Sequence, residues 1–214
     1  MHTEATIAFV KKTLADAEGG HDWFHIERVW KNAMHIAAQE GGANLEIVEL
    51  GALLHDIADA KFYDGDEEIG PKKAREFLET LDVTPAVIAH VENIVRHISF
   101  KGSREGQQFM SPELAIVQDA DRLDAIGAIG IARTFNYGGF KGRPLYDPAI
   151  APDPSMSKEE YKKGESPTIN HFYEKLLLLK DMMNTPTGKE LAAERHAFME
   201  TFLAEFFDEW EGRK

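Results

Sequence analysis

The stretch LGALLHDIADAKF at residues 50–62 has a helical pattern with two polar groups set inside it. Leu50 and Leu54 recur at the spacing of one helix face, so this face is expected to pack into a core. The adjacent His55 and Asp56 lie near the end of that helix. Burying an isolated imidazole or carboxylate is costly unless a partner compensates it, so this pair predicts a partner within the protein.

Apolar residues at helical spacing continue through most of the chain, and alternating patterns typical of strands are scarce. One helix is expected from an N-cap at Asp22 to a stop at Gly41, with His25 in its first turn. Pro71 and Pro85 are expected to open two more helices at their first positions. The remaining helices are expected at about residues 7–14, 47–58, 112–128, 169–183 and 189–210. The chain is therefore predicted to be all-α.

No repeat, low-complexity tract or obvious linker divides the sequence, so a single domain over residues 1–214 is the simplest organisation. Its core motifs are expected at 21–133 and its C-terminal helices at 169–211. Residues 136–167 are rich in Gly, Pro and charge, which predicts a long irregular lid. A stripe of Phe and Trp in the last helix is expected to pack inside the protein or at a homodimer interface.

The composition is that of an ordinary globular protein, with 43% hydrophobic and 29% charged residues. Cysteine is absent, which excludes disulfides and thiolate metal sites and fits a reducing cytoplasm. The formal charge of -13 opposes binding of duplex nucleic acid, because that attraction needs a basic surface. No apolar run is long enough for a signal peptide or a membrane span. We therefore expect a cytoplasmic protein that binds a small molecule and no membrane.

Two imidazoles and two carboxylates in separate helical stretches make a candidate site for one divalent cation: His25, His55, Asp56 and Asp121. A shared cation would compensate all four groups at once. Neighbouring residues on a helix point about 100° apart, so His55 and Asp56 converge on one ion only at a helix end or where the ion lies between them. Without cysteine, nitrogen and oxygen atoms must supply every protein ligand.

Three aspartates in the segment QDADRLDA compete for the last ligand position. Asp121 and Asp124 lie on neighbouring positions of one helical face, and Asp119 is the least suited of the three. Alternatively, these carboxylates form salt bridges with Arg122 or Arg133. The spacing alone leaves the choice open.

The joint pattern resembles the HD-domain metal-dependent phosphohydrolases, which carry H...HD...D on an all-helical bundle. The matching stretches are HDWFHIERVW at 21–30, LGALLHDIADAKF at 50–62 and VQDADRLDAIGAIGIAR at 117–133. HVENIVRHISF at 90–100 and INHFYEKLLLL at 169–179 further resemble the small bacterial HD hydrolases. The resemblance implies metal ligation by His25, His55, Asp56 and Asp121. It also implies a structural or orienting role for Asp124.

Two residues after the His-Asp pair are candidate catalytic groups. Asp59 shares a helix side with Asp56 and is a candidate to orient or deprotonate the attacking water. Lys61 resembles a phosphate-binding lysine. Arg28, one turn beyond His25, is a further candidate to bind the substrate. The alternative for each of these three side chains is a solvated position on the surface.

His90 and His97 are seven positions apart and share a helix face with Lys101. These three residues are candidates to bind a substrate phosphate, or the two histidines to hold a second metal. The alternative is that each imidazole bonds a carbonyl at the edge of the core. His21, just before the N-cap, is either an orienting or substrate-contacting group or incidental.

The expected lid holds aromatic and basic groups suited to stacking a base and contacting phosphates, a composition also found in plain surface loops: Tyr137, Lys141, Arg143 and Tyr146. Downstream, His171, Tyr173 and Lys175 resemble a motif of the family. Because they fall at a helix start, we expect them to support the core or to orient other groups.

The ligand set leaves positions on an octahedral ion for water and a substrate oxygen, and it suits Mn, with Fe, Co, Ni or Mg as alternatives. We expect hydrolysis of a phosphate ester or anhydride by metal-activated water. The resemblance implies a nucleotide substrate, with a nucleoside or deoxynucleoside triphosphate cut to monophosphate and pyrophosphate. The alternatives are a 5'-nucleotidase acting on monophosphates, a di-iron oxygenase of the same superfamily and a nucleotide sensor without turnover.

Overall fold

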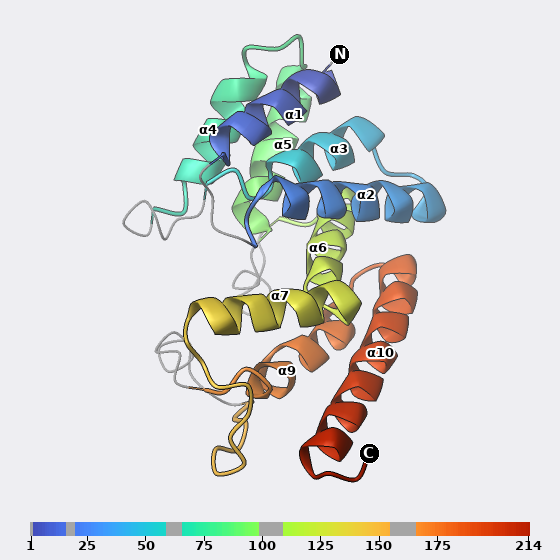
Figure 1. Cartoon of the computed structure of the whole chain (residues 1–214). Coiled ribbons are helices and arrows are strands. Elements are labelled where there is room, and N and C mark those ends of the chain that lie inside the picture. The colour runs from blue at the N-terminus through green and yellow to red at the C-terminus, as the bar shows by residue number, and fades with distance from the viewer. Residues whose placement is uncertain (1, 16–19, 59–65, 99–108, 155–165) are drawn as a thin grey trace. The chain divides into compact units, whose positions relative to one another are not determined.

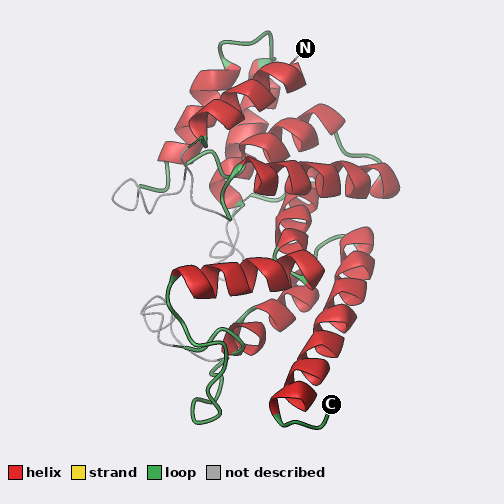
Figure 2. Ribbon diagram, viewed as in Figure 1, coloured by secondary structure: helices red, strands yellow, loops and turns green. Residues whose placement is uncertain are grey.

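The computed structural model describes residues 2–15, 20–58, 66–98, 109–154 and 166–214. All regular secondary structure in these segments is helical, as Figures 1 and 2 show, which confirms the all-α prediction. The chain divides into two compact units, Met1–Asp121 and Arg122–Lys214, with α6 (Pro112–Asp124) running across the division. No helix in the described segments is long and apolar enough to cross a membrane.

The first unit holds five helices ahead of α6: α1 (His2–Thr13), α2 (Trp23–Glu40), α3 (Leu45–Leu54), α4 (Ile69–Leu78) and α5 (Pro85–His97). Helix α3 is central, since it packs on α1, α2 and α5, while α4 packs on α5. The fully buried side chains that form the core come from these helices: Ile26, Ile36, Leu50, Leu53, Leu54 and Ile94. Helix α3 is therefore embedded in the core, as the apolar face of Leu50 and Leu54 predicts, although it ends at Leu54 and not at residue 58 as expected.

Helix α2 has the limits that its sequence predicts. The Asp22 side chain caps the N-terminus by accepting a hydrogen bond from the backbone N–H of His25, and Gly41 ends the helix at a φ of 68°. Pro85 opens α5 at its first position, as expected, behind an N-cap at Thr84. The expectation for Pro71 is wrong, because α4 already begins at Ile69.

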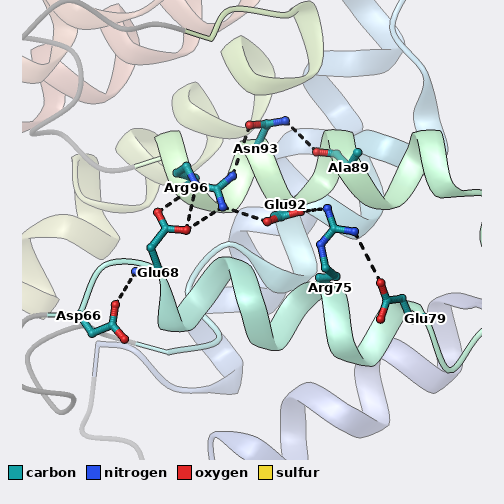
Figure 3. Close-up of polar contacts among 8 residues, drawn as sticks. All are labelled: Asp66, Glu68, Arg75, Glu79, Ala89, Glu92, Asn93 and Arg96. Carbon is teal, nitrogen blue, oxygen red and sulfur yellow. Dashed lines mark hydrogen bonds and ion pairs between the residues drawn. The ribbon is translucent and has the colours of Figure 1, made fainter.

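An ion-pair network joins α4 to α5 on the surface of the first unit (Figure 3). Glu92 accepts hydrogen bonds from both Arg75 and Arg96, and Arg96 also reaches Glu68 at the start of α4 through Nε at 3.0 Å and Nη2 at 2.8 Å. Burial acts to raise the pKa of Glu92, but the two guanidinium groups outweigh it and hold the pKa below its ordinary value. Exposed ion pairs contribute little one by one, so the network mainly fixes the register of the two helices.

The second unit contains α7 (Gly127–Phe140), α9 (Asn170–Glu174), the 3-10 helix η2 (Leu176–Met182) and α10 (Pro186–Trp210). Helix α10 packs on α7 and on η2, and α9 packs on η2. Aromatic rings fill the space between these elements: Phe135, Phe172, Phe202, Phe206, Phe207 and Trp210. Within the stripe, Phe202 and Phe206 pack against other rings as expected, whereas Phe198 and Trp210 are exposed.

Three boundaries in this unit differ from expectation. The helix expected at 112–128 stops at Asp124, and α7 starts at Gly127, whose φ of 72° favours glycine; a Cβ there would lie 3.0 Å from Arg195. Residues 136–140, expected to be irregular, complete α7. The helix expected at 169–183 is interrupted at Lys175, where φ is -144°. The rest of the described lid, 141–154, has turns and bends but no helix or strand, as expected.

A stability prediction follows from the contact between α3 and α5. A Cβ at Gly51 would lie 3.0 Å from Cδ1 of Ile94 and 3.6 Å from Cγ2 of Val117, whereas a Cβ at the helical Gly139 would meet no atom within 4 Å. Gly51→Val should therefore lower the free energy of unfolding by about 1 to 3 kcal/mol through overpacking. Gly139→Val is the matched control and should change it by less than about 0.5 kcal/mol. Urea denaturation measures both values, and equal effects would contradict the close approach of the two helices.

Candidate metal centre

Three helix segments of the first unit bring the predicted ligands together. His25 is the third residue of α2, and its backbone N–H is held by the Asp22 cap at 3.0 Å. Helix α3 ends at Leu54, so His55 and Asp56 follow directly at its C-terminal end. Asp121 lies in α6. The helix-end position that allows adjacent side chains to converge is therefore present.

The two histidines face each other with their Nε2 atoms 3.3 Å apart. Oδ1 of Asp121 lies 3.5 Å from Nε2 of His25 and 3.8 Å from Nε2 of His55. A carboxylate oxygen of Asp56 completes a group in which the ligand atoms of His25, His55 and Asp56 all lie within 4.8 Å of one another. His25, His55 and Asp56 thus form one cluster, and Asp121 lies beside it, facing the two imidazoles.

The protonation of His55 suits a metal ligand. Its Nδ1 lies 2.8 Å from the carbonyl oxygen of Ala52 and donates to it, so Nε2 presents a lone pair toward His25 and Asp121. Burial, the largest influence, lowers the pKa of His55, which keeps the imidazole neutral. Adjacent ligands with bonds of about 2.1 Å to one ion lie about 3 Å apart, close to the spacing found here. The donor set therefore fits a divalent cation.

His21 holds Asp56 in place. Its Nδ1 donates a hydrogen bond to Oδ2 of Asp56 at 2.5 Å. Burial acts to raise the pKa of Asp56, but the bond from His21 and the nearby imidazoles more than offset it, so the pKa is lowered and the carboxylate is ionised. The sequence left His21 open between an orienting group and an incidental one. Its four-residue spacing from His25 is the only signal that could have favoured the first.

Asp121 and Asp124 have different partners in the structure. Asp121 faces the two imidazoles, and its side chain keeps 37% exposure. Asp124, almost fully buried, forms an ion pair with Nη1 of Arg133 at 2.5 Å inside the second unit. Arg122 donates to the carbonyl oxygen of Met182. Asp124 is thus the salt-bridged carboxylate, and Asp119 is fully buried.

His90 and His97 have neighbours in the first unit that leave their predicted role in binding substrate untested. Nε2 of His90 lies 2.9 Å from Oγ of Ser111 and 3.3 Å from Oε2 of Glu113. The rings of both histidines contact Phe109. Within the described segments, the one group of three or more clustered metal-binding side chains is His25, His55 and Asp56, so the two histidines belong to no second cluster there.

The remaining candidates stay predictions. Arg28 is half-buried on α2, one turn after His25. Asp59, Lys61 and Lys101 lie outside the described residues. A connection that the sequence did not suggest is Glu113, which accepts from the backbone N–H of Asn44 at 2.9 Å and so ties the start of α6 to the N-cap of α3. Local patterns cannot predict this contact, because the two partners are 69 positions apart in the sequence.

Comparison with known proteins agrees with this geometry. The HD domain family model matches residues 23–126, a span that includes the four gathered side chains. The protein YpgQ of Bacillus subtilis is 40% identical over 196 residues, which cover 91% of this chain and 87% of YpgQ. This chain belongs to the HD domain family. The HD match also accounts for the helical architecture around the site.

Solved structures of HD proteins resemble the whole chain. An HD-superfamily hydrolase from Bacillus thuringiensis is 47% identical, with a TM-score of 0.78 over 98% of this chain and 97% of that one. The structure of Bacillus subtilis YpgQ in complex with ADP is 37% identical, with a TM-score of 0.72 over 97% of this chain and 94% of that one. The similarity of this HD protein to both therefore extends through both of its units.

Separate substitution of the two competing aspartates tests the geometry of the site. Asp121→Asn should abolish binding of Mn²⁺, because a carboxylate facing both imidazoles is lost. Asp124→Asn should keep the metal but lower the free energy of unfolding by about 1 to 3 kcal/mol, since Arg133 loses its charged partner. Metal content after gel filtration and urea denaturation distinguish the two effects. The reverse pattern of metal loss would contradict the assignment.

The hydrogen bond from His21 gives a second prediction. His21→Ala should weaken Mn²⁺ binding about 10- to 100-fold, because residues that orient metal ligands have effects of this size. His21→Gln keeps a donor near Asp56 and should recover part of the affinity. Isothermal titration with Mn²⁺ measures both constants. An unchanged affinity in His21→Ala would show that Asp56 needs no support from this side chain.

Proposed function

We propose that this protein is a metal-dependent phosphohydrolase that cleaves nucleoside triphosphates, deoxynucleotides included, into a monophosphate and pyrophosphate. The observation that carries the proposal is the convergence of two buried imidazole Nε2 atoms with the carboxylates of Asp56 and Asp121. Membership of the HD family supports hydrolysis, and the ADP complex of YpgQ supports a nucleotide ligand.

His25, His55, Asp56 and Asp121 would hold one divalent cation. Two neutral imidazoles and two carboxylates nearly balance its charge, and the mixed nitrogen and oxygen set favours Mn²⁺ over Mg²⁺ or Ca²⁺. A cation at this position supplies Lewis acidity for the attack of water on phosphorus. The fit of the site to a cation rests on the lone pair at Nε2 of His55, because its Nδ1 donates a hydrogen bond to the carbonyl oxygen of Ala52.

The residues of the chain prepare the site in distinct ways. The two histidines are buried, with 3% and 6% exposure, so their rings are held rigidly and shielded from water. Asp56 is ionised and oriented by His21. Asp121 is the most exposed of the four, so the site opens to solvent and substrate on its side.

The remaining catalytic steps are assigned to residues predicted from the sequence. Asp59, three positions after Asp56, is proposed to accept the proton of the attacking water. Lys61 is proposed to offset charge on the departing pyrophosphate. Arg28, His90, His97 and Lys101 are proposed to contact the substrate. Arg28 has the support of its position one turn after His25 on α2.

A product assay tests the function. Purified protein with Mn²⁺ and a panel of nucleoside and deoxynucleoside mono-, di- and triphosphates should release pyrophosphate from triphosphates as the first product. His55→Gln, which removes one ligand, should lose at least about 1,000-fold in kcat/KM, a barrier increase of about 4 kcal/mol. Orthophosphate as the sole product, from monophosphates, would identify a 5'-nucleotidase instead.

Two further outcomes would reject the proposal altogether. Equal activity after treatment with a chelator would exclude a role for the cation. Tight nucleotide binding without turnover under any divalent metal would identify a sensor. Lys189→Gln is a suitable control variant, because Lys189 is exposed and lies in the second unit, whereas the proposed ligands lie in the first.

A further inference from the structure

The second unit holds a cluster of three basic side chains that the metal site does not use. Arg143 follows the end of α7, His171 lies in α9, and Lys175 is the residue at which α9 ends. All three are half-buried. The sequence contains 37 acidic against 24 basic residues. A partly buried cluster of basic side chains is therefore unexpected from the composition.

The backbone around the cluster is fixed by hydrogen bonds. The N–H of Arg143 donates to the carbonyl oxygen of Gly138 at 2.9 Å, which holds the segment against the end of α7. The N–H of Thr168 donates to the carbonyl oxygen of Pro144 at 2.9 Å, which joins the same segment to the start of α9. A Cβ at Gly138 would lie 2.3 Å from Oγ1 of Thr168, so the two elements are in direct contact. Arg143 is thereby positioned beside α9.

His171 and Lys175 are joined by the last turn of α9. They are four residues apart, and the N–H of Lys175 donates to the carbonyl oxygen of His171 at 3.0 Å. The nearest carboxylate in sequence, Glu174, accepts hydrogen bonds from Oγ of Ser166 at 2.8 Å and from the N–H of Asp153 at 3.4 Å. Oε1 of Glu174 is therefore engaged by Ser166 and Asp153.

Arg143 carries an unsatisfied donor. Its Nε is buried and has no hydrogen-bond partner within the described segments, although its guanidinium lies over the ring of Tyr137 at 5.5 Å. A buried donor on a charged group costs free energy unless an acceptor reaches it. The guanidinium presents a planar fork whose geometry matches the oxygens of a phosphate.

The electrostatic potential around the cluster is positive. Burial, together with the positive charges of Lys175 and Arg143, lowers the pKa of His171 to about 3. Burial is the largest cause of this lowering, and the positive charges of Lys175 and Arg143 that add to it also attract an anion. Neutral His171 still has one N–H to donate.

We propose that Arg143, His171 and Lys175 form a binding site for a phosphate group within the second unit. The unsatisfied Nε of Arg143 and the charge of Lys175 bind phosphate oxygens, and His171 contributes a neutral donor. The phosphate belongs either to the phosphate chain of a nucleotide or to free pyrophosphate. The site requires neither the cation nor turnover, so its existence does not depend on the proposed hydrolysis.

Calorimetric titration of metal-free, full-length protein with pyrophosphate tests the site. The unmodified chain should bind pyrophosphate, and Arg143→Gln and Lys175→Gln should each bind it about tenfold or more weakly, as expected for loss of one charged hydrogen bond. Lys189→Gln removes the same charge from an exposed position on α10 and should change the affinity less than about twofold. Arg143→Lys keeps the charge without the fork and should be intermediate.

Two results would overturn the site: no binding of pyrophosphate to the unmodified chain, or equal weakening in Arg143→Gln and Lys189→Gln. Circular dichroism confirms that each variant is folded before titration. A second titration, with the protein saturated by a non-hydrolysable triphosphate, separates the two sources of phosphate. Loss of the pyrophosphate signal assigns the site to the nucleotide, and its persistence assigns the site to the free anion. Because no metal is present, failure of hydrolysis leaves these results unaffected.

Discussion

The approach of two buried imidazole nitrogens to 3.3 Å is the constraint on which the first unit depends. Two protonated rings would repel each other at this distance, and two lone pairs facing each other without a partner would be poorly compensated. The hydrogen bond from Nδ1 of His55 to the carbonyl oxygen of Ala52 leaves the lone pair of His55 on Nε2, which faces His25. A divalent cation at this point would accept both lone pairs and would attract the carboxylates of Asp56 and Asp121.

The positions of these residues at helix ends make this arrangement possible. His25 lies in the first turn of α2, where the Asp22 cap fixes the backbone, and His55 follows the last residue of α3. A side chain at a helix end can leave the direction that the helix interior would impose, which allows His55 and Asp56 to approach one point. Apolar packing on α1, α2 and α5 then fixes the end of α3, so the geometry of the site depends on a core formed elsewhere.

Local signals predicted much of this structure. Asp22 and Gly41 define α2 because capping acts within a few residues, and the spacing of His25, His55, Asp56 and Asp121 was sufficient to propose their convergence. The choice of Asp121 over Asp124 depended on the resemblance, since both share a helical face. Their different partners, two imidazoles and Arg133, become visible only in three dimensions.

Other features could not be read from the sequence because they depend on distant contacts. Gly127, where α7 begins after the break, has a φ of 72° and lies against Arg195, which is 68 positions away (195 minus 127). Residues 136–140 look irregular by composition, yet they complete α7, where Gly138 allows Thr168 to pack against the helix. Tertiary packing overrode the weak helix propensity of these glycines.

The strong negative charge of the chain limits how it can bind a phosphorylated ligand. With a formal charge of -13, long-range attraction of an anion is unfavourable, and at physiological salt such fields decay within about 8 Å. Affinity must therefore come from short-range contacts in places where the local potential is reversed. A cation held at His25 and His55 provides one such place, and the half-buried Arg143 and Lys175 provide another. Both concentrate positive charge where burial strengthens each contact, which favours specific phosphate binding over general attraction of polyanions.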